Sequence, residues 1–182
     1  MRAFLAIEPD DGTRRFLGEI QRQLKQTGVT GHYSFPENLH LTVRFLGEIN
    51  DGQFGELKKM IKEAARLNNK FVLNIDTIGK FGKGNKMILW AGMNENNSLS
   101  KLYDDIEFKL DAMMNLRKEN YFPHITLVRE AVSPIGFSDI RSRVGKVEYD
   151  FPVPGLSLME STRVNGRLAY IRRSFEPFEH EQ

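Results

Sequence analysis

Two histidines in the sequence are each followed, two positions later, by a threonine. The first motif, HLTV, begins at His40 within PENLHLTVRFLGE, and the second, HITL, begins at His124 within YFPHITLVRE. The chain has only four histidines, so a pattern shared by half of them is informative. Because side chains at positions i and i+2 of a strand point to the same face, each motif presents an imidazole beside a hydroxyl, from Thr42 or Thr126.

Two imidazoles facing one small site are suited to acid–base chemistry near neutral pH. One can accept a proton from a nucleophile while the other donates a proton to a leaving group. The hydroxyls of Thr42 and Thr126 can hydrogen-bond the non-bridging oxygens of a phosphate, and a nearby arginine can offset its charge. Such a set suits attack of water on a strained cyclic phosphodiester, and it requires no metal.

Two arginines are candidates for the cation beside that phosphate. Arg44 shares strand parity with His40 and Thr42, which places it on their face. Arg129 has the opposite parity to His124 and reaches the phosphate only if its strand ends, bulges or twists. Parity therefore favours Arg44.

Other readings of the polar residues carry less weight. A zinc site needs a third protein ligand, and the sequence has no HExxH or HxH spacing to supply one. The GKFGKG stretch at residues 79–84 lacks the spacing of a phosphate-binding loop, so residues 79–85 are interpreted as a turn. His32, in an expected loop, and His180, near the C-terminus, lack a threonine partner. Further RNA contacts are open to lysines and aromatic residues, namely Lys80, Lys83, Lys86, Phe35, Trp90, Tyr121 and Phe122.

The composition indicates an ordinary globular protein. The chain has 182 residues, of which 40% are hydrophobic and 27% charged, with a net charge of +2. That small charge predicts local anion binding, not a long nucleic-acid footprint. Cysteine is absent, which excludes thiolate chemistry. The first residues do not form a signal peptide and no stretch is long enough to span a membrane, so we expect a cytoplasmic protein, with a monomer as the simplest state.

Hydrophobic periodicity predicts strands and helices in alternation. Helices are expected after Asp10 and Asp11 with a stop at Gly28, from Asp51, and from about Ser98, with a short helix at residues 138–144. The predicted strands are residues 2–8, 39–46, 71–78, 87–93, 124–129, 147–151, 156–162 and 167–175, the last two forming a hairpin across Asn165 and Gly166. This order predicts an α+β fold with mainly antiparallel pairing. The motifs are 84 residues apart, as in a single pseudo-duplicated, two-lobed domain covering residues 1–182.

The sequence resembles the 2H phosphoesterases, and most closely their RNA 2',3'-cyclic phosphodiesterase branch, also called the 2'-5' RNA ligase family. The resemblance covers essentially the whole chain and rests on RAFLAIE, PENLHLTVRFLGE, LWAGM, FPHITLVR and SLMESTRVNGRLAYIRRSFEPF. It implies two pseudo-symmetric lobes whose sheets face a central cleft, with helices outside.

The resemblance also implies roles for individual residues. His40 would be the proton donor to the departing O3', and His124 the proton acceptor that activates water. Thr42, Thr126 and Arg129 would bind the phosphate, with no cofactor and no metal. The substrate would be RNA ending in a 2',3'-cyclic phosphate, which opens to a 2'-phosphomonoester.

Three alternatives stay open at this point. The main role could be 2'-5' RNA ligation, which is the reverse reaction with an RNA 5'-hydroxyl in place of water. It could instead be hydrolysis of a small cyclic nucleotide. A non-catalytic RNA- or nucleotide-binding module is the third, although pure binding does not require both an acid and a base.

Overall fold

The computed structural model describes residues 1–82 and 86–179. Its helical segments are α1 (Asp11–Gln26), the single 3-10 turn η1 (Pro36–Asn38), α2 (Asp51–Arg66), α3 (Asn97–Met113) and α4 (Phe137–Arg143). Its strands are β1 (Arg2–Ile7), β2 (Thr30–Tyr33), β3 (Leu41–Glu48), β4 (Phe71–Phe81), β5 (Met87–Met93), β6 (His124–Val132), β7 (Tyr149–Val153), β8 (Gly155–Val164) and β9 (Arg167–Pro177).

The strands of the described residues form one curled sheet in the order β7-β4-β5-β6-β3-β1-β8-β9, and β2 also pairs with β6. Every pairing between these strands is antiparallel. The predicted α+β class with antiparallel pairing is therefore confirmed. Strands β3 and β6 are joined through one residue pair, Leu41 with Ile125. The sheet thus bends into two halves at the point where both histidine motifs lie.

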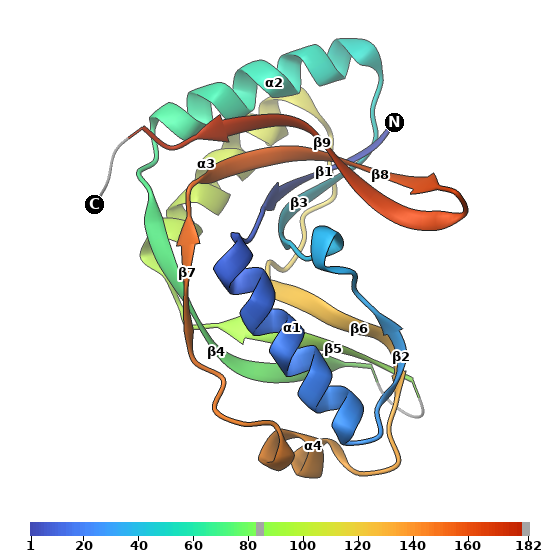
Figure 1. Cartoon of the computed structure of the whole chain (residues 1–182). Helices are drawn as coiled ribbons and strands as arrows, with labels where there is room; N and C mark the ends of the chain where they lie inside the picture. The colour runs from blue at the N-terminus through green and yellow to red at the C-terminus, as the bar shows by residue number, and fades with distance from the viewer. Residues whose placement is uncertain (83–85, 180–182) are drawn as a thin grey trace.

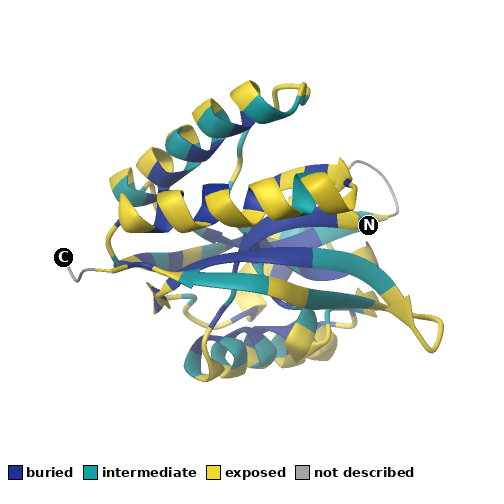
Figure 2. Cartoon of the chain, turned by 90° about the horizontal axis from the view of Figure 1, so that it is seen from above, coloured by how far each residue is buried: buried dark blue, intermediate teal, exposed yellow. Residues whose placement is uncertain are grey.

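Helices cover the outer faces of the two halves. Helix α2 packs on β8 and β9 and against α3, whereas α1 packs on β6 and β7 (Figure 1). Figure 2 shows that the buried faces of the helices turn toward the strands while their exposed faces point outward. This packing explains the amphipathic spacing that predicted the helices. The apolar stripe of each helix is buried against the sheet, where it is removed from water.

Short polar residues begin the three long helices, and the sequence predicted the first of them, Asp10. The side chain of Asp10 accepts a hydrogen bond from the Thr13 amide at the start of α1. Asn50 caps α2, and Asn96 caps α3 through the Leu99 amide. Each cap satisfies a backbone N–H that has no partner within its helix.

The turn predicted at residues 79–85 is corrected in part. Gly79 to Phe81 continue strand β4, and residues 83–85 lie outside the described residues, as does His180. Gly79 pairs with Trp90, whose ring covers it so closely that an added Cβ would lie 2.1 Å from a ring carbon. The glycine is required by this packing and not by a turn.

Strand β2 was not predicted, and the loop expected around His32 is wrong. His32 lies in β2 opposite Arg129 of β6. The strand has only four residues, three of them exposed, so it has no apolar alternation to reveal it. The predicted hairpin between β8 and β9 is confirmed, with positive φ at both Asn165 and Gly166.

Candidate active site

Both motif histidines are held in the same way. Nδ1 of His40 is 2.7 Å from the carbonyl oxygen of Asn38, and Nδ1 of His124 is 2.8 Å from that of Phe122. A carbonyl oxygen can only accept, so each Nδ1 carries the hydrogen and each Nε2 remains for chemistry. In each case the carbonyl belongs to the residue two positions before the histidine.

The sheet register brings the two motifs together. Leu41 lies directly opposite Ile125 in an antiparallel pair. That register places His40 across from Thr126 and Thr42 across from His124. Nε2 of His40 is 3.0 Å from the Thr42 hydroxyl, which donates to it. Sequence spacing predicted two related central strands, and the structure supplies the pseudo-two-fold relation between them.

Each motif strand has a bulge three residues after its histidine. Val43 is the extra residue in β3, since Thr42 and Arg44 face consecutive residues of β1. Leu127 is the extra residue in β6, since Thr126 and Val128 face consecutive residues of β5. A bulge interrupts the alternation of side chains between the two faces.

The bulges decide which arginine faces the cleft, and the parity argument for Arg44 is wrong. Val43 and Arg44 both turn into the core, where Arg44 is 2% exposed. Its guanidinium pairs with Glu107 at 2.5 Å and Glu119 at 2.9 Å and donates to the Arg117 carbonyl. The equivalent bulge in β6 buries two apolar residues and brings the next one, Arg129, to the cleft side.

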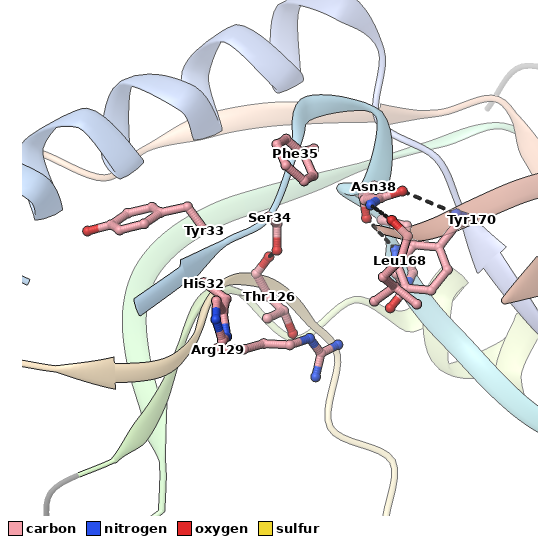
Figure 3. A pocket seen from close by; sticks show the side chains of 10 residues that line it. His32, Tyr33, Ser34, Phe35, Asn38, Thr126, Arg129, Leu168 and Tyr170 are labelled. Atoms are coloured by element: carbon pink, nitrogen blue, oxygen red, sulfur yellow. Dashed lines mark hydrogen bonds between the residues drawn. The ribbon is translucent and has the colours of Figure 1, made fainter. Parts of the chain in front are cut away.

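Arg129 lines a pocket of about 130 Å³ together with both members of one cross-strand pair, His40 and Thr126. In Figure 3, Thr126 and Arg129 form one side of this pocket, with Asn38, Leu168 and Tyr170 on the other. The carbonyl oxygen of Thr126 accepts a hydrogen bond from the Ser34 hydroxyl, which fixes that part of β6.

Asn38 joins the first motif to the C-terminal hairpin and was not identified from the sequence. Its side chain donates to the Leu168 carbonyl oxygen and accepts from the Tyr170 amide. Its own carbonyl oxygen holds His40. The Tyr170 ring then packs edge-on against His40, with centroids 4.8 Å apart. Nothing local in the sequence indicates this link, because Asn38 and Tyr170 are 132 residues apart.

Aromatic rings surround both imidazoles. The ring centroid of Phe4 lies 4.9 Å from that of His40, and the centroid of Phe81 lies 4.9 Å from that of His124. Burial disfavours the charged form of an imidazole. It lowers the pKa of His40 to about 4, assisted by the positive charge of Arg129 and opposed by the Asn38 carbonyl. Burial also lowers the pKa of His124, again assisted by Arg129.

The other residues considered for RNA contact fall into different environments. Trp90 is buried, and Tyr103 covers one face of the Tyr121 ring, with centroids 4.1 Å apart. Phe35 and Phe122 are half exposed. The remaining lysines are Lys80, whose ammonium lies 5.9 Å from the Phe137 ring, Lys86, which pairs with Glu130, and Lys83, which lies outside the described residues.

Neither metal-binding clusters nor spanning helices occur in the described part of the chain. No three histidine, cysteine, aspartate or glutamate side chains there are grouped so as to hold a metal ion. None of the described helices has the length and apolar character needed to cross a membrane.

Solved structures share this fold over essentially the whole chain. A protein of Thermus thermophilus superposes with a TM-score of 0.82 at 23% identity, covering all of both chains. Escherichia coli LigT in its apo form gives 0.79 at 21% identity, covering 100% of this chain and 98% of LigT. LigT complexed with 3'-AMP gives 0.77 at 20% identity, covering 97% of both. The fold is thus that of Escherichia coli LigT and of the Thermus thermophilus protein.

Sequence comparison gives the family. An RNA 2',3'-cyclic phosphodiesterase of Methanocaldococcus jannaschii is 30% identical over 71% of each chain. One from Methanothermobacter thermautotrophicus is 28% identical, also over 71% of each chain. The family described as LigT like Phosphoesterase matches residues 7–90. The protein belongs to the LigT-like phosphoesterase family.

Proposed function

We propose that this protein hydrolyses 2',3'-cyclic phosphodiesters at RNA ends to 2'-phosphomonoesters, with two histidines as the acid and the base and without a metal. The observation that carries the proposal is the pair of imidazoles on either side of the Leu41–Ile125 contact, each anchored at Nδ1 by a carbonyl oxygen. The names of the relatives from Methanocaldococcus jannaschii and Methanothermobacter thermautotrophicus support the substrate class.

The reaction proceeds with two proton transfers. Nε2 of neutral His124 accepts a proton from water as the water oxygen bonds to phosphorus. The P–O3' bond breaks, and Nε2 of protonated His40 donates its proton to O3'. The product keeps its phosphate on O2', and both histidines return to their starting states when a proton passes from one to the other through solvent.

Neutral side chains and one cation hold the phosphate during this exchange. The Thr42 and Thr126 hydroxyls donate to its non-bridging oxygens, and the Arg129 guanidinium offsets the negative charge that develops. Thr42 leaves its hydrogen bond to His40 when substrate binds. The bound anion also favours the protonated form of His40, which opposes the effect of burial. Substrate binding thereby favours the protonated form of His40, which the reaction requires as its acid.

The test is hydrolysis of a short RNA ending in a 2',3'-cyclic phosphate, in the presence of EDTA. His40→Ala and His124→Ala are each expected to lower kcat by roughly 10²- to 10⁴-fold. Phe108→Ala is the control, since Phe108 is 80% exposed on helix α3, away from the cleft. The product should resist enzymes specific for 3'-phosphates.

Other outcomes have definite meanings. Full turnover by either histidine variant would refute the acid–base pair, and recovery of a 3'-phosphate would refute cleavage of the P–O3' bond. Loss of wild-type turnover in EDTA, restored by a divalent cation, would refute metal independence. If wild type instead joins the cyclic end to an RNA 5'-hydroxyl faster than to water, 2'-5' ligation is the main reaction.

A further inference from the structure

The hairpin formed by strands β8 and β9 extends past the rest of the sheet, with its turn at the free end (Figure 1, Figure 2). In β9, Leu168 and Tyr170 line the smaller pocket beside His40, and Figure 3 shows them on one side of it. The Tyr170 ring also packs against the His40 ring, with centroids 4.8 Å apart. Residues 163–168, around the turn, are exposed. The hairpin therefore forms one wall of the cleft and continues beyond it.

The register of this hairpin places Arg163 on the wall that faces the cleft. Ser161 lies opposite Tyr170 and Arg163 opposite Leu168, with no register shift between these two pairs. Cross-strand partners share one face of a sheet, and residues two apart in a strand do so as well. The alternation that bulges interrupt in β3 and β6 is thus intact here. Arg167, whose parity in β9 is opposite to that of Leu168, points away from the cleft.

Arg163 adjoins a second cavity, which is larger than the first and also reaches His40. This cavity has a volume of about 390 Å³, and its wall includes Arg2, Phe45 and Ser161. Arg2 belongs to β1 and Ser161 to β8, which are paired strands. Arg163 follows Ser161 by two positions on the same face. The cavity therefore leads from His40 to an edge at which two arginines lie.

The arginines nearer the base of the hairpin are paired with carboxylates. Arg172 pairs with Glu8 at 2.7 Å, and Arg173 pairs with Glu160 across the hairpin itself. The positive charge of both guanidinium groups is thus offset within the protein. Arg172 and Arg173 tie β9 to its neighbouring segments and leave little charge for a ligand.

Arg2 and Arg163 have no such partner within the described residues. Glu48 lies opposite Arg2 in β3, but its carboxylate is 3.3 Å from the N-terminal ammonium group. Arg163 donates one hydrogen bond, from Nη1 to the Gly166 carbonyl oxygen at 2.9 Å. A guanidinium has five N–H donors, so the others remain for a ligand. Cations that lack a carboxylate partner therefore lie at the edge of the larger cavity.

This arrangement suits the backbone of an RNA strand. Arginine binds phosphate through paired N–H groups, and phosphate contacts position a nucleic acid without reading its sequence. When the cyclic phosphate lies beside His40, the preceding phosphate is joined to the 5'-oxygen of the same ribose. Leu168, opposite Arg163, lies two residues beyond Tyr170, or about 7 Å along the strand. That offset is comparable with one nucleotide.

We propose that Arg163 and Arg2 bind the phosphate that precedes the terminal nucleoside, so that the β8–β9 hairpin is an arm for an RNA chain. This proposal rests on the proposed function, because it takes the cyclic phosphate as the group held between the histidines. A cyclic mononucleotide has no preceding phosphate, so the arm favours RNA ends over small cyclic nucleotides. The net charge of +2 agrees with contact to one or two phosphates and not to a long duplex.

The experiment compares two substrates that end in the same nucleoside. One is cytidine 2',3'-cyclic phosphate, and the other is the trinucleotide ApApC ending in a 2',3'-cyclic phosphate. kcat/KM is measured over a range of salt concentrations for wild type, Arg163→Gln, Arg2→Gln and Arg167→Gln. Arg167→Gln is the matched control, because it removes the same charge from the same hairpin on the face away from the cleft.

Arg163→Gln and Arg2→Gln should each lower kcat/KM on the trinucleotide by on the order of tenfold and leave the mononucleotide within about twofold. The logarithm of kcat/KM on the trinucleotide should also depend less steeply on the logarithm of salt concentration, by about 0.7 for each lost contact. Arg167→Gln should match wild type on both substrates. Arg163→Lys should retain most of the preference for the trinucleotide, because lysine keeps the charge that binds phosphate.

Other outcomes would refute the arm. Equal losses on both substrates would mean that Arg163 only supports the hairpin turn, and no loss on the trinucleotide would mean that RNA does not reach it. An equal loss in Arg167→Gln would reduce the effect to net charge. Equal kcat/KM of wild type for the two substrates would also refute the arm. In all these cases the two-histidine hydrolysis stands, whereas failure of wild type to hydrolyse either substrate would refute the proposed function itself.

Discussion

Among the described residues, Leu41 and Ile125 form the one residue pair that joins the two halves of the sheet, and both are fully buried. Each residue lies immediately after a motif histidine. The contact therefore fixes two catalytic candidates at once, since neither half can shift along the other without moving one histidine away from the opposite threonine. The local equivalence extends to the Nδ1 anchors and to the bulges at Val43 and Leu127.

The pH dependence of turnover should differ between the free and the substrate-bound protein. The lowered pKa of His124 places the acidic limb of kcat/KM below pH 6.5. In the free protein the pKa of His40 is about 4, whereas a bound phosphate raises it. The alkaline limb of kcat should therefore lie at higher pH than that of kcat/KM. Profiles of both constants from pH 4 to 9 test this expectation, and coincident alkaline limbs would contradict it.

Stability should also depend on pH through His40. Its pKa is about 4 in the folded protein and about 6.5 in the unfolded chain, so between these values the unfolded chain binds more protons. The folded state is therefore favoured above pH 6.5 and loses stability as the pH falls toward 4. Urea unfolding at pH 7 and pH 4.5 should show a larger loss for wild type than for His40→Gln, by about 2 kcal/mol. Equal losses of stability in wild type and His40→Gln would contradict the lowered pKa of His40.

The two arginines considered for the phosphate should behave oppositely when replaced. Arg44→Met leaves Glu107 and Glu119 without their partner and should lower stability by about 3 kcal/mol, or roughly 6–12 °C in Tm. Arg129→Met should leave Tm nearly unchanged and lower kcat by roughly 10²- to 10³-fold. Thermal melts and initial rates below the melting range separate these effects. A large loss of turnover in well-folded Arg44→Met would restore the parity argument.

Glycine substitutions test the packing beneath the second histidine. An added Cβ at Gly79 would lie 2.1 Å from the Trp90 ring, which packs near His124. Gly79→Ala should therefore destabilise the protein by about 1–3 kcal/mol. Gly18, within helix α1, has no atom within 4 Å of an added Cβ, so Gly18→Ala should stabilise by about 0.5–1 kcal/mol. Chemical denaturation measures the change in the free energy of unfolding of each variant. Destabilisation by both substitutions would contradict the packing argument.

The chemistry and the local structure could be predicted from the order of the residues alone. The two His-x-Thr motifs, the cap at Asp10 and the Asn165–Gly166 hairpin are local features, because propensity, capping and turn geometry depend on neighbours in the chain. Strand parity is also a local argument. Its prediction for the two arginines was wrong because it takes no account of the neighbouring strand. A bulge arises where a strand meets its partner, so parity alone placed Arg44 in the cleft and Arg129 outside it.

Which side chains meet depends instead on how the chain folds back on itself. Three contacts join residues that are distant in the chain or lie on neighbouring strands: Asn38 with Tyr170, Leu41 with Ile125, and Trp90 with Gly79. Their positions depend on how two curled half-sheets bury apolar residues on their outer, helix-covered faces. That packing buries Val43 and Leu127 in the core. As a consequence, Phe45 and Arg129 face the cleft.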